Sequence, residues 1–274
     1  MAIRQKELGI TKVAFFTVVH PQNEKFLLSF LNSLNNQTYK KFDLVVVNDG
    51  LKNFRQFIND FSNLNFIELN SGYSHIKNRE IGINYCIKKK YNFLIFGDSD
   101  DYFESNRIET SIKLLKKNDI IINDVSTFNK NGIIKNKYFS NRLNNYQTIN
   151  FDFIEEKNIF GLSNTALNLK NLSILEFPNN IIALDWYIFS IFLINGKKAI
   201  FTNDTLSYYR QHKKNFVGLK KIDIASFKKG LDIKIAHYKA MSKFNINFKT
   251  KLEMIYKRKF TTKDIKFPLW WEQI

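Results

Sequence analysis

Three carboxylates lie within four residues of one another, Asp98, Asp100 and Asp101, directly after the apolar run 93–96. Like charges at this spacing repel one another unless a cation or hydrogen-bond donors compensate them. Carboxylate oxygens are hard ligands that suit Mg²⁺ or Mn²⁺, and such an ion can neutralise charge on a leaving diphosphate. The turn therefore predicts a divalent-cation site that handles a phosphorylated ligand. The alternative is a solvated acidic turn that caps the next helix.

Asp49 and Arg79 occupy positions from which they could assist such a site. Asp49 lies in the turn Asn48-Asp49-Gly50 at a predicted strand end, where it could accept hydrogen bonds from a base or ribose. Asp-Gly is also an ordinary turn. Arg79 opens the helix that leads to the acidic strand and could pair with a phosphate or with the acidic turn. A plain surface arginine is the alternative.

Asp185 interrupts an otherwise apolar segment that is predicted to be helical at 182–194. A carboxylate there is costly unless it is paired or lines a cleft, and partial burial would raise its pKa toward useful base strength. A buried structural acid is the alternative. His212 ends a predicted strand and could bind a metal or a phosphate, although a lone histidine is usually structural. The other histidines have no comparable context: His20, His75 and His237.

Alternating strands and helices place these residues at strand ends. Apolar runs predict strands at 13–19, 42–47, 65–69, 93–96 and 119–125. Helical spacing predicts helices at 24–34, 54–61, 76–89 and 105–117. This alternation indicates an α/β fold, with a mostly parallel central sheet and helices on both faces. Ligands in such sheets bind at the carboxyl ends of the strands, where Asp49 and the acidic turn fall.

The second half of the chain is less regular. The pattern predicts a turn at 129–132 between short strands, a helix at 182–194, and two strands at 197–201 and 205–210. From residue 222 the chain is helical and basic, and Trp270 and Trp271 lie near its end. We therefore expect one α/β domain over residues 1–215 and a basic helical C-terminal extension over 216–274.

The composition, with 44% hydrophobic and 24% charged residues, is typical of a globular protein and excludes a disordered one. A net charge of +17 favours anionic partners, although Lys, Asn, Ile and Phe are abundant throughout and the charge could be compositional. The single cysteine, Cys86, excludes an intrachain disulfide, fits a reducing compartment and is predicted to lie in the core. No run of about 20 apolar residues is present. We therefore expect a cytoplasmic protein.

In their order along the chain, these pieces resemble family 2 glycosyltransferases with a GT-A fold. The matching elements are the first strand, Val45-Val46-Val47-Asn48-Asp49-Gly50, Gly72-Tyr73-Ser74 through Asn78-Arg79 to Gly82-Ile83, Asp98-Ser99-Asp100-Asp101, Leu184-Asp185-Trp186 and Tyr209-Arg210-Gln211-His212. The ordered set covers residues 12–213 and is far more specific than any single motif. Two departures stand out. The family's Tyr-Asn after the first strand is replaced by Val19-His20-Pro21-Gln22, and its Glu-Asp pair by Leu184-Asp185.

The resemblance implies an inverting enzyme that moves a sugar from a nucleoside-diphosphate donor, a UDP-sugar by default, to an acceptor hydroxyl. A role in surface polysaccharide or glycolipid synthesis is implied, with a saccharide or lipid-linked acceptor and no nucleic-acid partner. Asp185 would be the base, and Asp100 and His212 would hold Mg²⁺ or Mn²⁺. The implied donor-binding residues are Thr17, Val19, Asp49, Arg79, Asp98, Ser99 and Asp100.

Two other function classes share parts of this pattern. A haloacid-dehalogenase-like phosphatase also has Asp-x-Asp after an apolar strand, but on its first strand and usually before Gly-Thr, whereas three strands come earlier here and Tyr102 follows. A non-catalytic basic module would bind an anionic polymer or a membrane surface through its C-terminal residues. Those residues are Lys249, Lys251, Lys257, Arg258, Lys259, Trp270 and Trp271. An enzyme that touches the inner membrane face through this tail would combine both hypotheses. An ordinary packed helix with its tryptophans in the core is the competing interpretation.

Overall fold

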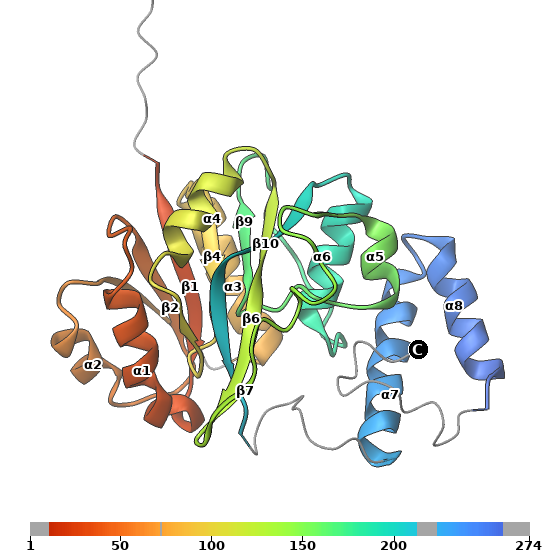
Figure 1. The fold of residues 1–274 in the computed structure, drawn as a ribbon, viewed down its shortest axis with the longest axis horizontal. Helices are drawn as coiled ribbons and strands as arrows, with labels where there is room; N and C mark the ends of the chain where they lie inside the picture. Colours follow the sequence, from red (N-terminus) through yellow and green to blue (C-terminus); the bar gives the residue numbers. More distant parts are fainter. Residues whose placement is uncertain (1–10, 72, 213–223, 260–274) are drawn as a thin grey trace, which may run out of the picture.

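A curled, mostly parallel sheet forms the centre of the protein (Figure 1). The structure is a computed structural model that describes residues 11–71, 73–212 and 224–259. The strands are β1 (Val13–Val19), β2 (Asp43–Asn48), β3 (Asn65–Asn70), β4 (Phe93–Phe96), β5 (Tyr102–Phe103), β6 (Ile120–Asn129), β7 (Gly132–Lys135), β8 (Thr148–Ile149), β9 (Thr165–Asn168) and β10 (Ala199–Arg210). In the described residues their order is β3-β2-β1-β4-β9-β6-β10-β5, with β7 beside β6 and β8 beside β10.

The parallel part of the sheet confirms the alternation read from the sequence. β1 pairs in parallel with both β2 and β4, and β2 pairs in parallel with β3. The connecting helices are α1 (Glu24–Asn35), after the 3-10 turn Pro21–Asn23, α2 (Phe54–Asp60), α3 (His75–Lys88) and α4 (Arg107–Leu115). Because β2 and β4 run in the same direction on either side of β1, their carboxyl ends meet at one edge of the sheet.

The strands of the second half differ from the sequence prediction. β9 lies antiparallel between β4 and β6, where no strand was predicted. The two strands expected at 197–201 and 205–210 are one strand, β10, whose pairing with β6 shifts register between Thr202 and Leu206. The polar residues in that irregular segment break the apolar run, so the pattern reads as two strands. The turn predicted at 129–132 is confirmed as the hairpin between β6 and β7.

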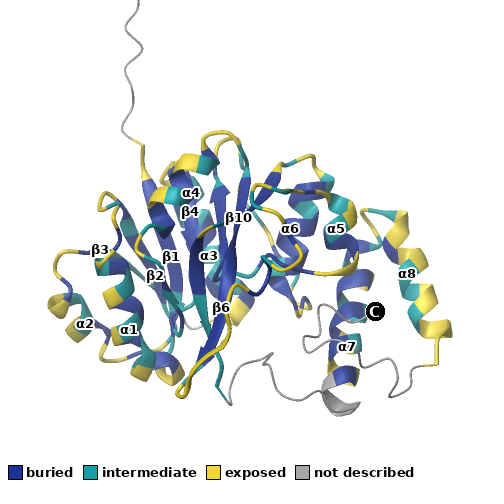
Figure 2. Cartoon of the chain, viewed as in Figure 1, coloured by how far each residue is buried: buried dark blue, intermediate teal, exposed yellow. Residues whose placement is uncertain are grey.

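Helices cover both faces of the sheet, as predicted. Alternate side chains of β1 point to opposite faces, so Phe15 packs on Phe30 of α1, with ring centroids 6.0 Å apart. Phe16 packs on α3, where a Cβ added to Gly82 would lie 2.0 Å from the Phe16 ring. Cys86 is fully buried behind this contact, which confirms its predicted place in the core. Figure 2 shows the buried strands between helices whose outer sides are exposed.

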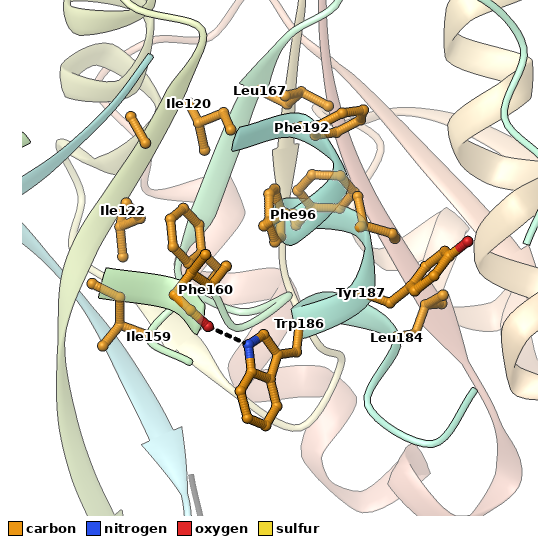
Figure 3. Packing of buried hydrophobic residues seen from close by; sticks show 14 of the residues in the cluster. Phe96, Ile120, Ile122, Ile159, Phe160, Leu167, Leu184, Trp186, Tyr187 and Phe192 are labelled. Atoms are coloured by element: carbon orange, nitrogen blue, oxygen red, sulfur yellow. Dashed lines mark hydrogen bonds between the residues drawn. The ribbon is translucent and has the colours of Figure 1, made fainter. Parts of the chain in front are cut away.

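The C-terminal helices pack on the same core as the sheet. α5 (Phe151–Glu156) and α6 (Leu184–Ile194) precede α7 (Ile224–Met241) and α8 (Ile246–Lys257). His237 of α7 stacks on Trp186 with centroids 4.0 Å apart, and Phe248 of α8 meets Phe151 at 5.6 Å. Figure 3 shows Trp186 among the buried residues, where its Nε1 donates to the Ile154 carbonyl at 2.7 Å. These contacts tie α7 and α8 to residues of the α/β domain.

Two sequence predictions for the C-terminal region stay open. The boundary at 215/216, Trp270 and Trp271 lie outside the described residues.

Among the helices that the structure describes, none combines the length and the apolar character that crossing a membrane requires.

Candidate active site

Charged side chains gather where β1, β2 and β4 end. Asp49 follows β2, and its backbone N–H donates to the Val19 carbonyl at 2.8 Å. The acidic turn follows β4, beginning with Gly97, whose N–H donates to the Phe16 carbonyl at 3.1 Å. His20 follows β1 and is close enough to Asp49 and Asp100 for both carboxylates to influence its titration. Burial lowers the pKa of His20, and these carboxylates oppose that effect. His20 thus lies near both predicted acidic sites, a position that its sequence context did not reveal.

Arg79 and Asp98 form an ion pair at this edge of the sheet. The Arg79 Nη2 lies 3.3 Å from the Asp98 Oδ1, and its Nη1 donates to the His75 carbonyl at 3.2 Å. The two side chains are 22% and 35% exposed, so both remain open to a ligand. Burial raises the pKa of Asp98, while the arginine beside it acts in the opposite direction. The pair fits the prediction that Arg79 serves the acidic turn, and its guanidinium could also bind a phosphate.

His212, two residues after the end of β10, meets Asp100. The His212 Nε2 lies 2.9 Å from the Asp100 Oδ2, and the side chains are 19% and 16% exposed. Arg210, two residues earlier, donates from Nε to the Asp100 carbonyl at 2.6 Å and from Nη2 to the Ser29 Oγ at 2.8 Å. Its guanidinium also lies 4.6 Å from the ring centroid of Phe26. This anchoring fixes the distance between the acidic turn and the end of β10.

The Asp100–His212 pair fits a divalent cation as two of its ligands. A carboxylate oxygen and an imidazole nitrogen face each other, which is a donor set that suits Mn²⁺ better than Mg²⁺. Within the described part of the chain, no group of three or more His, Cys, Asp and Glu side chains is arranged to hold a metal. A cation here would therefore take its remaining ligands from a diphosphate and from water.

Asp101, Ser99, Thr17 and Val19 are buried in the interior. Asp101 accepts hydrogen bonds from the Arg210 N–H at 2.8 Å and from the Ser163 hydroxyl, which makes it a structural acid. Ser99 donates to the Val18 carbonyl at 2.9 Å. Thr17 and Val19 are 2% and 1% exposed. A contribution of Ser99, Thr17 and Val19 to donor binding remains a prediction, and it would have to come through the backbone that they hold in place.

A cavity of about 730 Å³ leads from the Arg79–Asp98 pair to Asp185. Polar groups of Asn158, Ser163 and Asn164 also line it, whereas Asp49, Asp100 and His212 are not among its lining residues. His75, Thr127 and Gly161 line it as well. The rest of its wall is mostly apolar and comes from Val125, Tyr138, Phe139, Ile159, Leu162, Ile181, Ile182, Ala183, Leu184 and Tyr209. Asp98 lies both at this cavity and in the acidic turn, so it connects the two parts of the site.

Asp185 lies in the first turn of α6 and not inside the helix, because α6 begins at Leu184 and not at 182 as the apolar pattern predicted. A helix N-terminus favours a negative charge, and the Asp185 Oδ1 accepts the Trp186 N–H at 2.8 Å. Burial outweighs these effects and raises the pKa of Asp185 to about 6. A carboxylate with this pKa at a cavity wall can accept a proton from a hydroxyl group at neutral pH.

Known proteins resemble this chain both in sequence and in structure. The sequence profile named Glycosyl transferase family 2 matches residues 16–173. Glycosyltransferase GlyA of Streptococcus pneumoniae serotype 4 is 27% identical over 208 residues, which are 69% of this chain and 29% of GlyA. This chain therefore spans less than a third of that relative.

Solved structures share the fold. TarS of S. aureus, in complex with UDP, matches with a TM-score of 0.60 and 15% identity over 90% of this chain and 71% of the TarS chain. The mannosyltransferase PcManGT of Pyrobaculum calidifontis, in complex with GDP-Man and Mn²⁺, matches with a TM-score of 0.60 and 13% identity over 89% and 69% of the respective chains. These likenesses establish the predicted GT-A architecture.

Proposed function

Because this chain belongs to glycosyl transferase family 2, we propose that it transfers a sugar from a nucleoside-diphosphate donor to an acceptor hydroxyl with inversion at the anomeric carbon. The observation that carries the proposal is the cavity that joins Arg79 and Asp98 to Asp185. It leads from a group that can bind phosphate to a group that can accept a proton. TarS and PcManGT, which share the fold, are seen with UDP and with GDP-Man. A UDP-sugar is our default donor.

Each residue has a separate task in this proposal. Asp49 accepts hydrogen bonds from the base or ribose, and Arg79 faces the diphosphate. Asp185 takes the proton of the acceptor hydroxyl, whose oxygen attacks the anomeric carbon from the face opposite the leaving diphosphate. One base suffices, since a single displacement inverts the centre without a covalent enzyme intermediate. Mn²⁺ or Mg²⁺ held by Asp100 and His212 would supply positive charge against the leaving diphosphate.

Titration calorimetry with UDP, GDP, CDP and ADP in the presence of Mn²⁺ tests the donor assignment. We expect one of these nucleotides to bind clearly more tightly than the others. Arg79→Gln should weaken that binding by about tenfold or more, because a hydrogen bond between charged groups is lost. Arg55→Gln, at an exposed position of α2, is the matched control and should bind normally. If none of the four nucleotides binds, the non-catalytic basic module becomes the better hypothesis.

The acceptor that we propose is a saccharide or a lipid-linked molecule used in surface polysaccharide or glycolipid synthesis. A lipid-linked acceptor would be met at the inner membrane face. The outer side of α8 favours such a contact, because Ile246 and Met254 are 67% and 65% exposed there. The cations Lys249 and Lys257 are exposed on the same helix, and Arg258 is exposed directly after it. Lys251 is the exception among the predicted basic residues, since its Nζ turns inward to Glu155 and Glu156 at 3.3 and 2.7 Å.

Co-sedimentation with vesicles tests this membrane contact. The triple variant Lys249→Gln, Lys257→Gln and Arg258→Gln should bind anionic phosphatidylglycerol vesicles about 100-fold more weakly, at about 1 kcal/mol per charge. The control is Lys113→Gln, Lys116→Gln and Lys117→Gln, three exposed lysines at the end of α4. Equal losses in the two triple variants would attribute the binding to overall charge and not to α8. Equal binding of the wild type to neutral phosphatidylcholine vesicles would contradict an electrostatic contact.

A further inference from the structure

A buried amide lines the same cavity as the carboxylate that we assign as the base. Asn158 lies between α5 and β9, is 7% exposed and lines the same cavity as Asp185. Its Oδ1 accepts the Phe160 backbone N–H at 2.9 Å. Since this oxygen already has a donor, the Nδ2 group is the end of the amide left to act on the Asp185 carboxylate, whose pKa Asn158 lowers. The loop backbone thus determines which end of the amide faces the base.

A backbone hydrogen bond within α6 also holds Asp185. Its Oδ1 accepts the Trp186 N–H at 2.8 Å. The Trp186 indole is fixed in turn by its bond to the Ile154 carbonyl and by stacking on His237. We propose, on the basis of the function proposed above, that Asn158 is a positioning residue that holds Asp185 in its charged, proton-accepting form and directs it into the cavity. Asn158 acts through Asp185 and takes no proton itself.

The sign of the effect on pH dependence follows from the groups around Asp185. A hydrogen bond donated to a carboxylate favours its charged form, so Asn158 lowers the pKa of Asp185. Arg79 on α3 acts in the same direction, whereas Asp98 after β4 and burial act in the opposite one. His75, Tyr138 and Tyr209 are the other titratable side chains that line this cavity. Loss of the Asn158 donor should therefore raise the pKa of Asp185 and protonate more of it at neutral pH.

The experiment measures kcat against pH for two variants, at saturating donor. Asn158→Asp keeps an oxygen for the Phe160 N–H but loses the donor and adds a like charge. The rise of kcat on the acidic side of its pH profile, the acidic limb, should therefore move to higher pH, by about one pH unit or more. Asn158→Leu loses only the donor and should move the limb less, in the same direction. In both variants kcat should approach the wild-type value at alkaline pH, with the KM for the donor unchanged. Asn150→Asp, at the N-cap of α5, is the control and should not move the limb.

The outcomes separate this inference from the proposed function. If Asp185→Asn is inactive while both Asn158 variants keep the wild-type limb, the positioning role is wrong and the base assignment stands. If Asp185→Asn keeps full turnover, the base assignment itself is wrong. A partly unfolded variant lowers kcat equally at every pH and leaves the midpoint in place, so a shifted limb is not produced by lost stability alone. Circular dichroism over the same pH range checks that condition.

Discussion

Asp185→Asn should lower kcat by about 10²- to 10⁴-fold, the usual contribution of a positioned general base. Asparagine keeps the size of the side chain and an oxygen for the Trp186 N–H, but it cannot accept the acceptor's proton. Donor affinity should stay within about twofold of the wild type, because the proposed donor contacts lie at Arg79 and the acidic turn. Stopped assays of sugar transfer and calorimetry with the nucleotide measure the two quantities separately.

The pH profile adds a second check on the role of Asp185. Burial raises the pKa of this carboxyl to about 6, so wild-type kcat should rise with pH through about 6 as the base loses its proton. The residual turnover of Asp185→Asn should lack this limb. Asp152→Asn is the matched control, since Asp152 also lies in the first turn of a helix, α5, but is exposed. Full turnover in Asp185→Asn, or an unchanged limb in its residual rate, would remove Asp185 as the base.

The sequence predicts the half of the sheet whose strands are buried on both faces. β4 is a continuous apolar run, and β1 and β2 are apolar apart from Thr17 and the two ends of β2, so they stand out from their polar flanks. β9 has four residues, and β5 and β8 have two each. None of them is long enough to show the alternation of apolar and polar residues that marks a strand. The apolar residues Ile182 and Ala183 precede α6 and make the helix look longer than it is. Short strands and apolar loops are therefore the elements that the pattern misses.

The residues of the candidate site also fall into those that the sequence predicts and those that it does not. Asp49, Asp98 and Asp100 could be found because they directly follow recognisable strands. His212 meets Asp100 across 112 positions of the chain, and only the resemblance to a family connected the two in advance. His20 and Asn158 lie in connections without periodicity, where a polar residue is expected whatever its role. Their environment depends on tertiary contacts, such as the bond between Asn158 and the Phe160 N–H, that no local pattern encodes.

The carboxylates of the acidic turn are compensated in different ways. Asp101 is satisfied by the Arg210 N–H and the Ser163 hydroxyl, and Asp98 by Arg79. Arg107 is fully buried, donates to the Phe96 carbonyl at 2.5 Å, and adds positive charge near both acids. Asp100 has His212 as its side-chain neighbour, and a histidine offers a full charge only when it is protonated. Of the three acids, Asp100 is thus the one best placed to accept a cation.

Asp100→Asn should accordingly lower metal-dependent transfer by about 100-fold or more, since charge stabilisation by a bound metal is worth several kcal/mol. An amide keeps the shape of the turn but is a much poorer ligand for a hard cation. The requirement for Mn²⁺ should weaken as well, with half-maximal activation moving to higher concentration. Asp60→Asn, at the exposed end of α2, is the control and should keep both values.

His212→Gln supplies the stricter test, because it asks whether the two side chains hold the same ion. If Asp100 and His212 share one cation, either substitution alone removes most of the rate enhancement that the cation supplies. The double variant should then be little worse than Asp100→Asn alone. If they act separately, the two losses should multiply. Manganese binding measured by electron paramagnetic resonance, with donor nucleotide present, shows the shared ligation directly. Two results would contradict the metal role: wild-type activity that persists in excess chelator, and an Asp100→Asn variant that binds Mn²⁺ normally. Asp100 would then serve only to hold the acidic turn against His212.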